Sequence, residues 1–410
     1  MIKNKNKLFS VASDLVFSVA GLVLMNGVLQ FVIYSLLRKW VGNEAFGDYQ
    51  SILAVVSIMG TTFGVAANYS RMVRSREKKD TNGDYNIFLT VISVLCVVVS
   101  AVTLVVYNSF SIAHFLLLSV LMVVTVLRYY GDVNYRIKLN YKGFFVYYAI
   151  ITVGYCLGLV FFRYVSEQWM VTFIAGETAA VVFVLLHGDI FKGKKLLSPS
   201  PEFGKTMKSV SILSATNLLS SVAQQADKII LGIAMNGEAV TIFYVATLLG
   251  KVISLLTTPL NGVLIGYLTK YDGKVTKKMM AIFIAALSGL GLIALFVCYF
   301  ASKIIVKILH PEVYDAAEQY FFLATAGQIF YFIANCLMTV ILRIASEKFQ
   351  MYINIAYIAI YAVTVIPLTI TYGLWGMTIA LLIANGAKFA ITGIVGFIKT
   401  EKSQPKEITE

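Results

Sequence analysis

The sequence predicts an all-helical polytopic membrane protein, with twelve transmembrane helices arranged in two six-helix lobes around a central cavity. Three observations lead to this fold class: the composition, the lengths of the apolar runs, and the distribution of basic residues between them. Of the 410 residues, 59% are hydrophobic and 13% are charged, whereas soluble domains carry about 25% charged residues. The composition therefore excludes a soluble globular protein.

The lengths of the apolar runs set the number of spans. A helix needs about 20 apolar residues to cross the hydrocarbon core of a bilayer. Twelve runs have roughly this length, at residues 11–37, 48–70, 86–107, 112–130, 143–163, 168–187, 208–235, 240–268, 279–300, 320–342, 350–371 and 374–398. The first run is longer than the apolar core of a signal peptide and no small-residue cleavage site follows it, so we expect an uncleaved span.

Basic residues alternate between the connections. Twenty-six of the 34 lysines and arginines fall in every second connection, six fall in the remaining connections, and two, Lys251 and Lys388, lie inside apolar runs. This alternation is typical of the positive-inside sorting of a protein that crosses the bilayer many times. Because the number of spans is even, both ends of the chain are predicted to be cytoplasmic.

Several classes of function are excluded by what the chain lacks. The net charge of +13 arises in short loops that would face the anionic cytoplasmic leaflet, so we expect no nucleic-acid partner. The sequence has no Walker motif and no Ser/His/Asp grouping, and we expect neither an enzyme nor a cofactor. The cysteines lie within apolar runs without the spacing of metal ligands, so no metal site is predicted at Cys96, Cys156, Cys298 or Cys336.

A polar, basic connection at 188–207 divides the spans six and six, and it contains Pro199 and Pro201. We therefore predict an N-terminal six-helix lobe at 1–187, a cytoplasmic linker at 188–207, a C-terminal six-helix lobe at 208–398 and a cytoplasmic tail at 399–410. Six spans return a chain to the side on which it started. The lobes would thus be parallel repeats with a cavity between them.

Polar residues recur on single faces of the seventh and eighth predicted spans. At 100° per residue, the polar residues of the eighth span occupy an arc of about 80°. We interpret these faces as the lining of a hydrated lumen. The candidate substrate-binding residues are Tyr244, Thr247, Lys251 and Ser254 on the eighth span, Asn217, Gln224 and Lys228 on the seventh, Gln30 on the first and Lys388 on the twelfth.

The two lysines inside apolar runs are the sharpest candidates. A cation near the centre of a span costs about 2.5–3.5 kcal/mol on insertion scales, so water or a partner is required. Lys251 would either meet an anionic substrate or form an ion pair with a buried acid such as Glu177 or Asp227. Lys388, with Asn385 on its face, would either bind substrate or serve helix packing.

Three acids are candidates for coupling transport to an ion gradient. Glu177 is the acid at mid-depth in an otherwise apolar span, and its alternative role is that of a hydrogen-bonded packing residue. Asp14 lies about one turn into the first span and could simply be hydrated. Asp227 adjoins Lys228 near the outer end of the seventh span, where it would pair with the first outer loop or contact substrate.

Two segments resemble a known family. The segment from Phe31 to Ile58 contains Gly42, Phe46, Gly47 and Tyr49, and it resembles the Gly-x-x-x-Phe/Tyr-Gly-x-Tyr loop of Wzx-type polysaccharide flippases. The seventh span and the following loop are similar to a second signature of that family. It consists of an Asp ahead of an apolar run and then Tyr-x-x-Ala, and it is matched loosely by Asp227, Tyr244 and, one place early, Ala246.

The resemblance implies membership of the multidrug/oligosaccharidyl-lipid/polysaccharide exporter (MOP) superfamily, with the fold of its MATE transporters. It implies a flippase that moves undecaprenyl-diphosphate-linked oligosaccharide repeat units, of lipopolysaccharide or capsule, across the bacterial cytoplasmic membrane by alternating access. An H⁺ or Na⁺ gradient or the membrane potential would drive transport. The expected partners are the lipid-linked oligosaccharide, the bilayer, the coupling ion, and the polysaccharide polymerase and glycosyltransferases.

Two rival functions use the same architecture. A multidrug or cation antiporter of the MATE type would favour acids in its lumen, whereas Lys251 favours an anionic substrate. A lipid II flippase usually has fourteen spans and a more basic first lobe. A polysaccharide polymerase or ligase would need a larger outer loop than the connection between residues 301 and 319.

Overall fold

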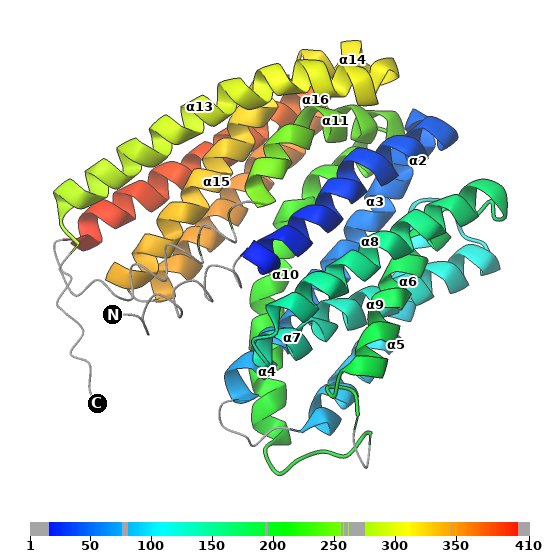
Figure 1. The fold of residues 1–410 in the computed structure, drawn as a ribbon. Coiled ribbons are helices and arrows are strands. Elements are labelled where there is room, and N and C mark those ends of the chain that lie inside the picture. Colours follow the sequence, from blue (N-terminus) through cyan, green and yellow to red (C-terminus); the bar gives the residue numbers. More distant parts are fainter. Residues whose placement is uncertain are drawn as a thin grey trace, which may run out of the picture. The chain divides into compact units, whose positions relative to one another are not determined.

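The computed structural model describes residues 16–75, 81–192, 196–255, 257, 261, 275–345 and 347–400. The chain separates into two compact units, Met1–Ile229 and Ile230–Glu410, and each is described by itself (Figure 1). Within the described residues all regular structure is helical. Asp14, one of the coupling candidates, lies outside the described residues.

The first unit is a bundle of membrane-length helices. Its first span runs over Val16–Val41 and includes the π-helical segment η1 and helix α2. The elements that follow are α3, η2 and α4, which together form the second span, and then α5 to α9 and most of α10. Their bounds are η1 Leu29–Ile33, α2 Tyr34–Val41, α3 Asn43–Met59, η2 Gly60–Gly64, α4 Val65–Arg74, α5 Asn82–Val106, α6 Ile112–Gly131, α7 Val133–Ile137, α8 Tyr141–Tyr164, α9 Met170–His187 and α10 Phe203–Ala234.

The second unit contains α11, the long helices α13 and α15, the short helix α14, and α16. Their bounds are α11 Gly237–Leu255, α13 Lys277–Leu309, α14 Pro311–Glu318, α15 Phe321–Ile344 and α16 Glu347–Thr400. Helix α16 combines two helices at a break at Gly373, where φ is 56° and ψ is −133°. Residues with a Cβ rarely adopt a positive φ, whereas glycine adopts it without a steric clash.

Ten of the described helices are long and apolar enough to cross a membrane. The twelve predicted spans are recovered when α16 is divided at Gly373 and α10 is added. Helix α10 has 32 residues but carries the polar face of the seventh predicted span, which lowers its hydropathy. Most of the eighth predicted span beyond Leu255 lies outside the described residues. The predicted all-helical, twelve-span architecture is confirmed.

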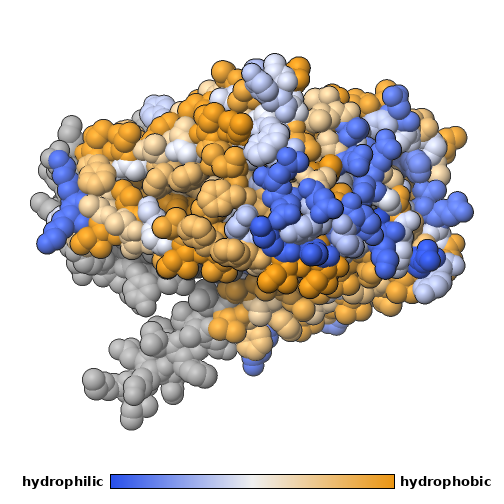
Figure 2. Space-filling view, turned by 90° about the horizontal axis from the view of Figure 1, so that it is seen from above, coloured by the Kyte–Doolittle hydropathy of each residue, from blue (hydrophilic) through white to orange (hydrophobic). Residues whose placement is uncertain are grey.

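The exposed surface of the helices is apolar, as a lipid-facing surface must be. The most apolar window of α13 is only 11% buried, whereas that of the second span, Asn43–Arg74, is 72% buried. Exposed side chains on α13 include Leu290, Ile293 and Val297, each about 60% accessible. Figure 2 shows hydrophobic residues over a large part of one face, with most hydrophilic residues toward the right of the view and a smaller group at its left edge.

Helices α8 and α9 approach each other closely through small residues. A Cβ on Gly154 would lie 2.6 Å from the Cα of Gly176, and a Cβ on Gly158 would lie 2.6 Å from the carbonyl oxygen of Thr172. Gly154 and Gly158 form a GxxxG pair, which lets the backbones of membrane helices meet. This contact brings Tyr155 on α8 against α9 at the level of Glu177.

Candidate functional site

The first unit contains a buried ion pair between neighbouring helices. The Nε of Arg128 on α6 donates to Oε2 of Glu177 on α9 at 2.7 Å, and its Nη2 donates to Oε1 at 3.1 Å. The hydroxyl of Tyr155 donates to Oε1 of the same carboxylate at 2.6 Å. The charged side chains are 6% and 5% exposed. A planar guanidinium facing a carboxylate through two hydrogen bonds is the strongest geometry for such a pair.

Further contacts hold Arg128 from both sides. Its guanidinium lies 3.7 Å from the ring centroid of Tyr129, a cation–π distance. The hydroxyl of Tyr147 on α8 donates to the carbonyl of Arg128 at 2.7 Å. Three helices therefore converge on one neutral pair.

A second acid of this unit is also paired. Asp132, at the junction of α6 and α7, accepts hydrogen bonds from Nε and Nη2 of Arg136, both at 3.0 Å. The hydroxyl of Tyr148 donates to it at 3.1 Å, and the amide of Asn68 also donates to it. Glu177 and Asp132 are therefore both neutralised by arginine in the interior of the first unit.

The sequence did not reveal Arg128 as an interior residue. Its position at the end of the fourth apolar run predicts a place in the basic connection that follows, yet it is 5% exposed and lies within α6. The signal was present, because Arg128 falls inside the apolar run 112–130 and Glu177 needs a positive partner. The structure pairs Glu177 with Arg128, and the alternative of an ion pair between Lys251 and a buried acid stays a prediction.

The polar face of α10 contacts the second span within the first unit. Gln225 donates to the hydroxyl of Ser57 at 3.2 Å, and Nζ of Lys228 donates to Oε1 of Gln50 at 3.0 Å. Asn217 reaches the carbonyl of Thr61 at 3.5 Å. The candidates Asn217 and Lys228 therefore lie at a helix–helix contact.

The other candidates of the first unit differ in exposure. Gln224 is exposed on α10, and Asp227 on the same helix is buried. Gln30 is half-buried in η1. Their roles in binding and coupling stay predictions.

The second unit buries a lysine among neutral groups. Lys388 on α16 is 3% exposed. Its Nζ donates to Oδ1 of Asn335 on α15 at 2.9 Å, and it lies 4.4 Å and 4.8 Å from the ring centroids of Tyr331 and Tyr357. Among the described residues, no carboxylate pairs with this ammonium group. Its positive charge is therefore not neutralised by the part of the chain that the structure describes.

Two other polar side chains on the same face of α16 donate hydrogen bonds to backbone carbonyls. Nδ2 of Asn385 donates to the carbonyl of Gly327 at 3.0 Å, and the hydroxyl of Thr392 donates to the carbonyl of Lys388 at 2.6 Å. Oδ1 of Asn385 is buried without a hydrogen-bond partner. We refer to Lys388, Asn335, Tyr331 and Tyr357 as the lysine cage.

The polar stripe of the eighth span lies on α11. Tyr244 and Thr247 are fully buried, and the hydroxyl of Thr247 donates to the carbonyl of Phe243 at 2.9 Å. Ser254 approaches Oε1 of Gln328 on α15 at 3.4 Å, and Lys251 is half-buried. Two members of the stripe are thus enclosed in the second unit, and two are partly accessible.

Comparison with known proteins finds similarity to solved structures and none by sequence. No family model matches the chain, and no curated protein matches its sequence. An inward-facing multidrug resistance MATE family transporter of the MOP superfamily matches with a TM-score of 0.65 and 12% identity, over 95% of this chain and 94% of that one. The Vibrio cholerae MATE transporter VcmN in its bent form matches with a TM-score of 0.61 and 12% identity, over 98% of both chains.

A third solved structure has the same fold and a different description. It is a MOP superfamily transporter from Pyrococcus furiosus, matched with a TM-score of 0.59 and 13% identity over 96% of this chain and 95% of that one; the reverse polarity of its binding pocket is said to suggest a different function. At these identities the likeness concerns the fold alone. The chain is a multi-pass membrane protein with the fold of the MATE transporters of the MOP superfamily.

Proposed function

We propose that this protein is a flippase that moves undecaprenyl-diphosphate-linked oligosaccharide repeat units across the bacterial cytoplasmic membrane by alternating access. The lysine cage is the observation that carries the proposal. A buried cation whose described partners are all neutral favours an anionic ligand, because an opposite charge compensates the cost of burying it. A lipid-linked diphosphate supplies such an anion.

The pairing of the acids supports the same polarity. A transporter of cationic drugs would use carboxylates that are free to meet its substrate. Glu177 and Asp132 are instead occupied by Arg128 and Arg136. The Pyrococcus furiosus transporter illustrates that pocket polarity can differ between proteins of this fold.

The physical task also fits this architecture. A glycan and a diphosphate cannot cross about 30 Å of hydrocarbon unaided, whereas hydroxyls, amides and lysines can replace their water. We propose that Tyr244, Lys251 and Ser254 on α11 contribute to this path together with Lys388. The lipid tail would remain in the bilayer.

For ion coupling we favour Asp14 and Asp227 over Glu177. The carboxylate of Glu177 accepts three hydrogen bonds, two of them from a guanidinium, so it is held as a structural group. H⁺ and Na⁺ are the candidate ions. A polysaccharide polymerase would receive the product and glycosyltransferases would supply the substrate.

Transport in proteoliposomes tests the proposal. A fluorescent lipid-linked oligosaccharide is incorporated, and its translocation is measured by loss of access to a membrane-impermeant reagent. Lipid II and a cationic dye are offered in parallel, with H⁺ or Na⁺ gradients imposed. We expect movement of the oligosaccharide lipid, whereas dye efflux without it would establish the antiporter, and lipid II movement alone would establish the second rival.

A charge reversal sharpens this experiment. Lys251→Glu should abolish translocation because it places an anion on the proposed path. Lys307→Glu, at an exposed position of α13 in the same unit, makes the same change of charge on the surface of that unit and should leave translocation intact. Full activity of Lys251→Glu would refute the cationic path at α11.

A further inference from the structure

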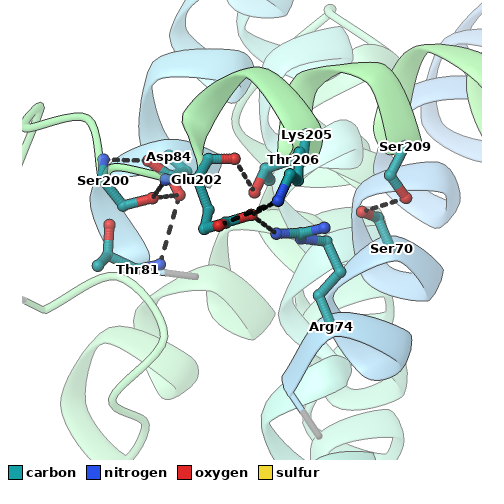
Figure 3. A network of polar contacts seen from close by, with 9 residues as sticks. All are labelled: Ser70, Arg74, Thr81, Asp84, Ser200, Glu202, Lys205, Thr206 and Ser209. Atoms are coloured by element: carbon teal, nitrogen blue, oxygen red, sulfur yellow. Dashed lines mark hydrogen bonds and ion pairs between the residues drawn. The ribbon is translucent and has the colours of Figure 1, made fainter. Parts of the chain in front are cut away.

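The predicted linker is bonded to the first unit. Ser200 donates to Asp84 at the start of α5 through its backbone N–H at 2.7 Å and through its hydroxyl at 2.6 Å (Figure 3). Nδ2 of Asn86 donates to the carbonyl of Leu196 at 3.0 Å. A Cβ on Gly83 would lie only 2.1 Å from the carbonyl oxygen of Ser198, so the two backbones are in close contact. The chain at residues 196–200 is thus fastened across the beginning of α5.

The start of α10 is fastened to α4 in the same region. Arg74 on α4 lies 3.6 Å from the carboxylate of Glu202, which Lys205 also contacts at 3.0 Å (Figure 3). One turn further, the hydroxyl of Ser70 donates to that of Ser209 at 3.1 Å. The linker is therefore hydrogen-bonded to α5, and the start of α10 that follows it is bonded to α4.

Contacts continue along α10 as far as Lys228. Thr61 in η2 donates to the hydroxyl of Ser221 at 2.8 Å. Lys228 contacts Gln50 on α3. From Ser209 to Lys228 this polar contact extends about 29 Å, at 1.5 Å per residue. Rigid-body rocking of two lobes would open such an interface at one end, whereas helices of a single body keep contact along their full length.

We propose that the linker and α10, up to about Ile229, move as part of the first unit during transport. The flexing element then lies after Ile229, at the connection Met235–Asn236 or in the last turns of α10, and residues 196–207 of the linker form a static strap. The inference goes beyond the proposed substrate. It rests on the proposed function only in assuming alternating access.

Disulfide cross-links test which body α10 belongs to. Three double variants join α10 to the second span: Ser70→Cys with Ser209→Cys near the linker, Thr61→Cys with Ser221→Cys in the middle, and Ser57→Cys with Gln225→Cys at the far end. The short hydroxyl–hydroxyl distances of the first two pairs place them within reach of a disulfide. Because the long Gln225 side chain makes the third contact, that pair is joined with a reducible bifunctional thiol reagent. The four native cysteines are first replaced, namely Cys96, Cys156, Cys298 and Cys336.

Translocation is measured for each variant before and after reduction, so that every protein serves as its own folding control. We expect the oxidised and reduced forms to transport equally for all three pairs. Loss of transport in an oxidised form, restored by reduction, would overturn the proposal, because that end of the interface must then open.

A substrate-free measurement separates this inference from the proposed function. If reduced proteins do not move the oligosaccharide lipid, the proposed function fails, and spin-label distances decide the question of α10. Labels at the exposed positions Ile212 on α10 and Val91 on α5 should give one narrow distance distribution. Labels at Ile212 and Ile293 on α13 should give a broader one. Two populations in the first pair with a single population in the second would overturn the proposal.

Discussion

Arg128 in the first unit and Lys388 in the second are both buried cations, but they are stabilised in different ways. Arg128 in the first unit faces a carboxylate through two hydrogen bonds, whereas Lys388 in the second faces an amide oxygen and two aromatic rings. In the first arrangement the two opposite charges compensate each other. The second has no carboxylate partner among the described residues, and a bound anion can offset the cost of burying its charge. Burial alone therefore does not distinguish the two cations, whereas the charge of their partners does.

Removing Arg128 tests the structural half of the comparison and should have the largest effect. Arg128→Ala leaves Glu177 buried without its partner, which typically costs about 3–5 kcal/mol. We expect a strong loss of thermal stability in detergent. Arg128→Met combined with Glu177→Gln removes both charges and should recover much of the loss, whereas equal instability of the two proteins would contradict a role for charge pairing.

Removing Lys388 tests the functional half. Lys388→Met deletes a buried charge that has no described carboxylate partner, so thermal stability should change little while translocation of the oligosaccharide lipid is lost. Both are measured on the same purified protein. Retained transport, or collapse of the fold, would make Lys388 a packing residue.

The supporting hydroxyl groups give a finer comparison. Tyr155→Phe removes a 2.6 Å hydrogen bond to the Glu177 carboxylate, and we expect a loss of about 2 kcal/mol. Tyr331→Phe keeps the ring over Lys388 and should cost less. The melting temperatures of the two variants provide the measurement, and a larger loss in Tyr331→Phe would reverse the assignment.

The exposed ion pair between Lys303 and Glu318 should show the smallest effect. Its side chains are 37% and 36% exposed, and exposed pairs contribute little. The hydrogen bond from Lys303 lowers the pKa of Glu318. Its contribution is therefore present above the ordinary carboxyl pKa and is lost as pH falls through the lowered value. Glu318→Gln should remove this small dependence on acid pH, and an unchanged melting profile in acid would contradict the pairing.

Much of the fold could be predicted, because the length of an apolar run reports directly on membrane crossing. Lys388 was identified for the same reason, since it lies deep within a run. Arg128 was not, because a basic residue near the end of a run resembles one in a loop. The partner of the polar face of α10 was also missed, since periodicity shows which face is polar but not whether water or the second span covers it. The roles of the predicted substrate and coupling residues stay predictions.

The break at Gly373 has a consequence for membrane insertion. Without it, the 54 residues of α16 would form a rod about 80 Å long at 1.5 Å per residue, far longer than a bilayer is thick. A Cβ on Gly376 would lie only 1.7 Å from the carbonyl of Leu368, so the two halves turn back within a few residues. The backbone of Gly373 therefore decides that the segment 347–400 crosses the membrane twice and not once.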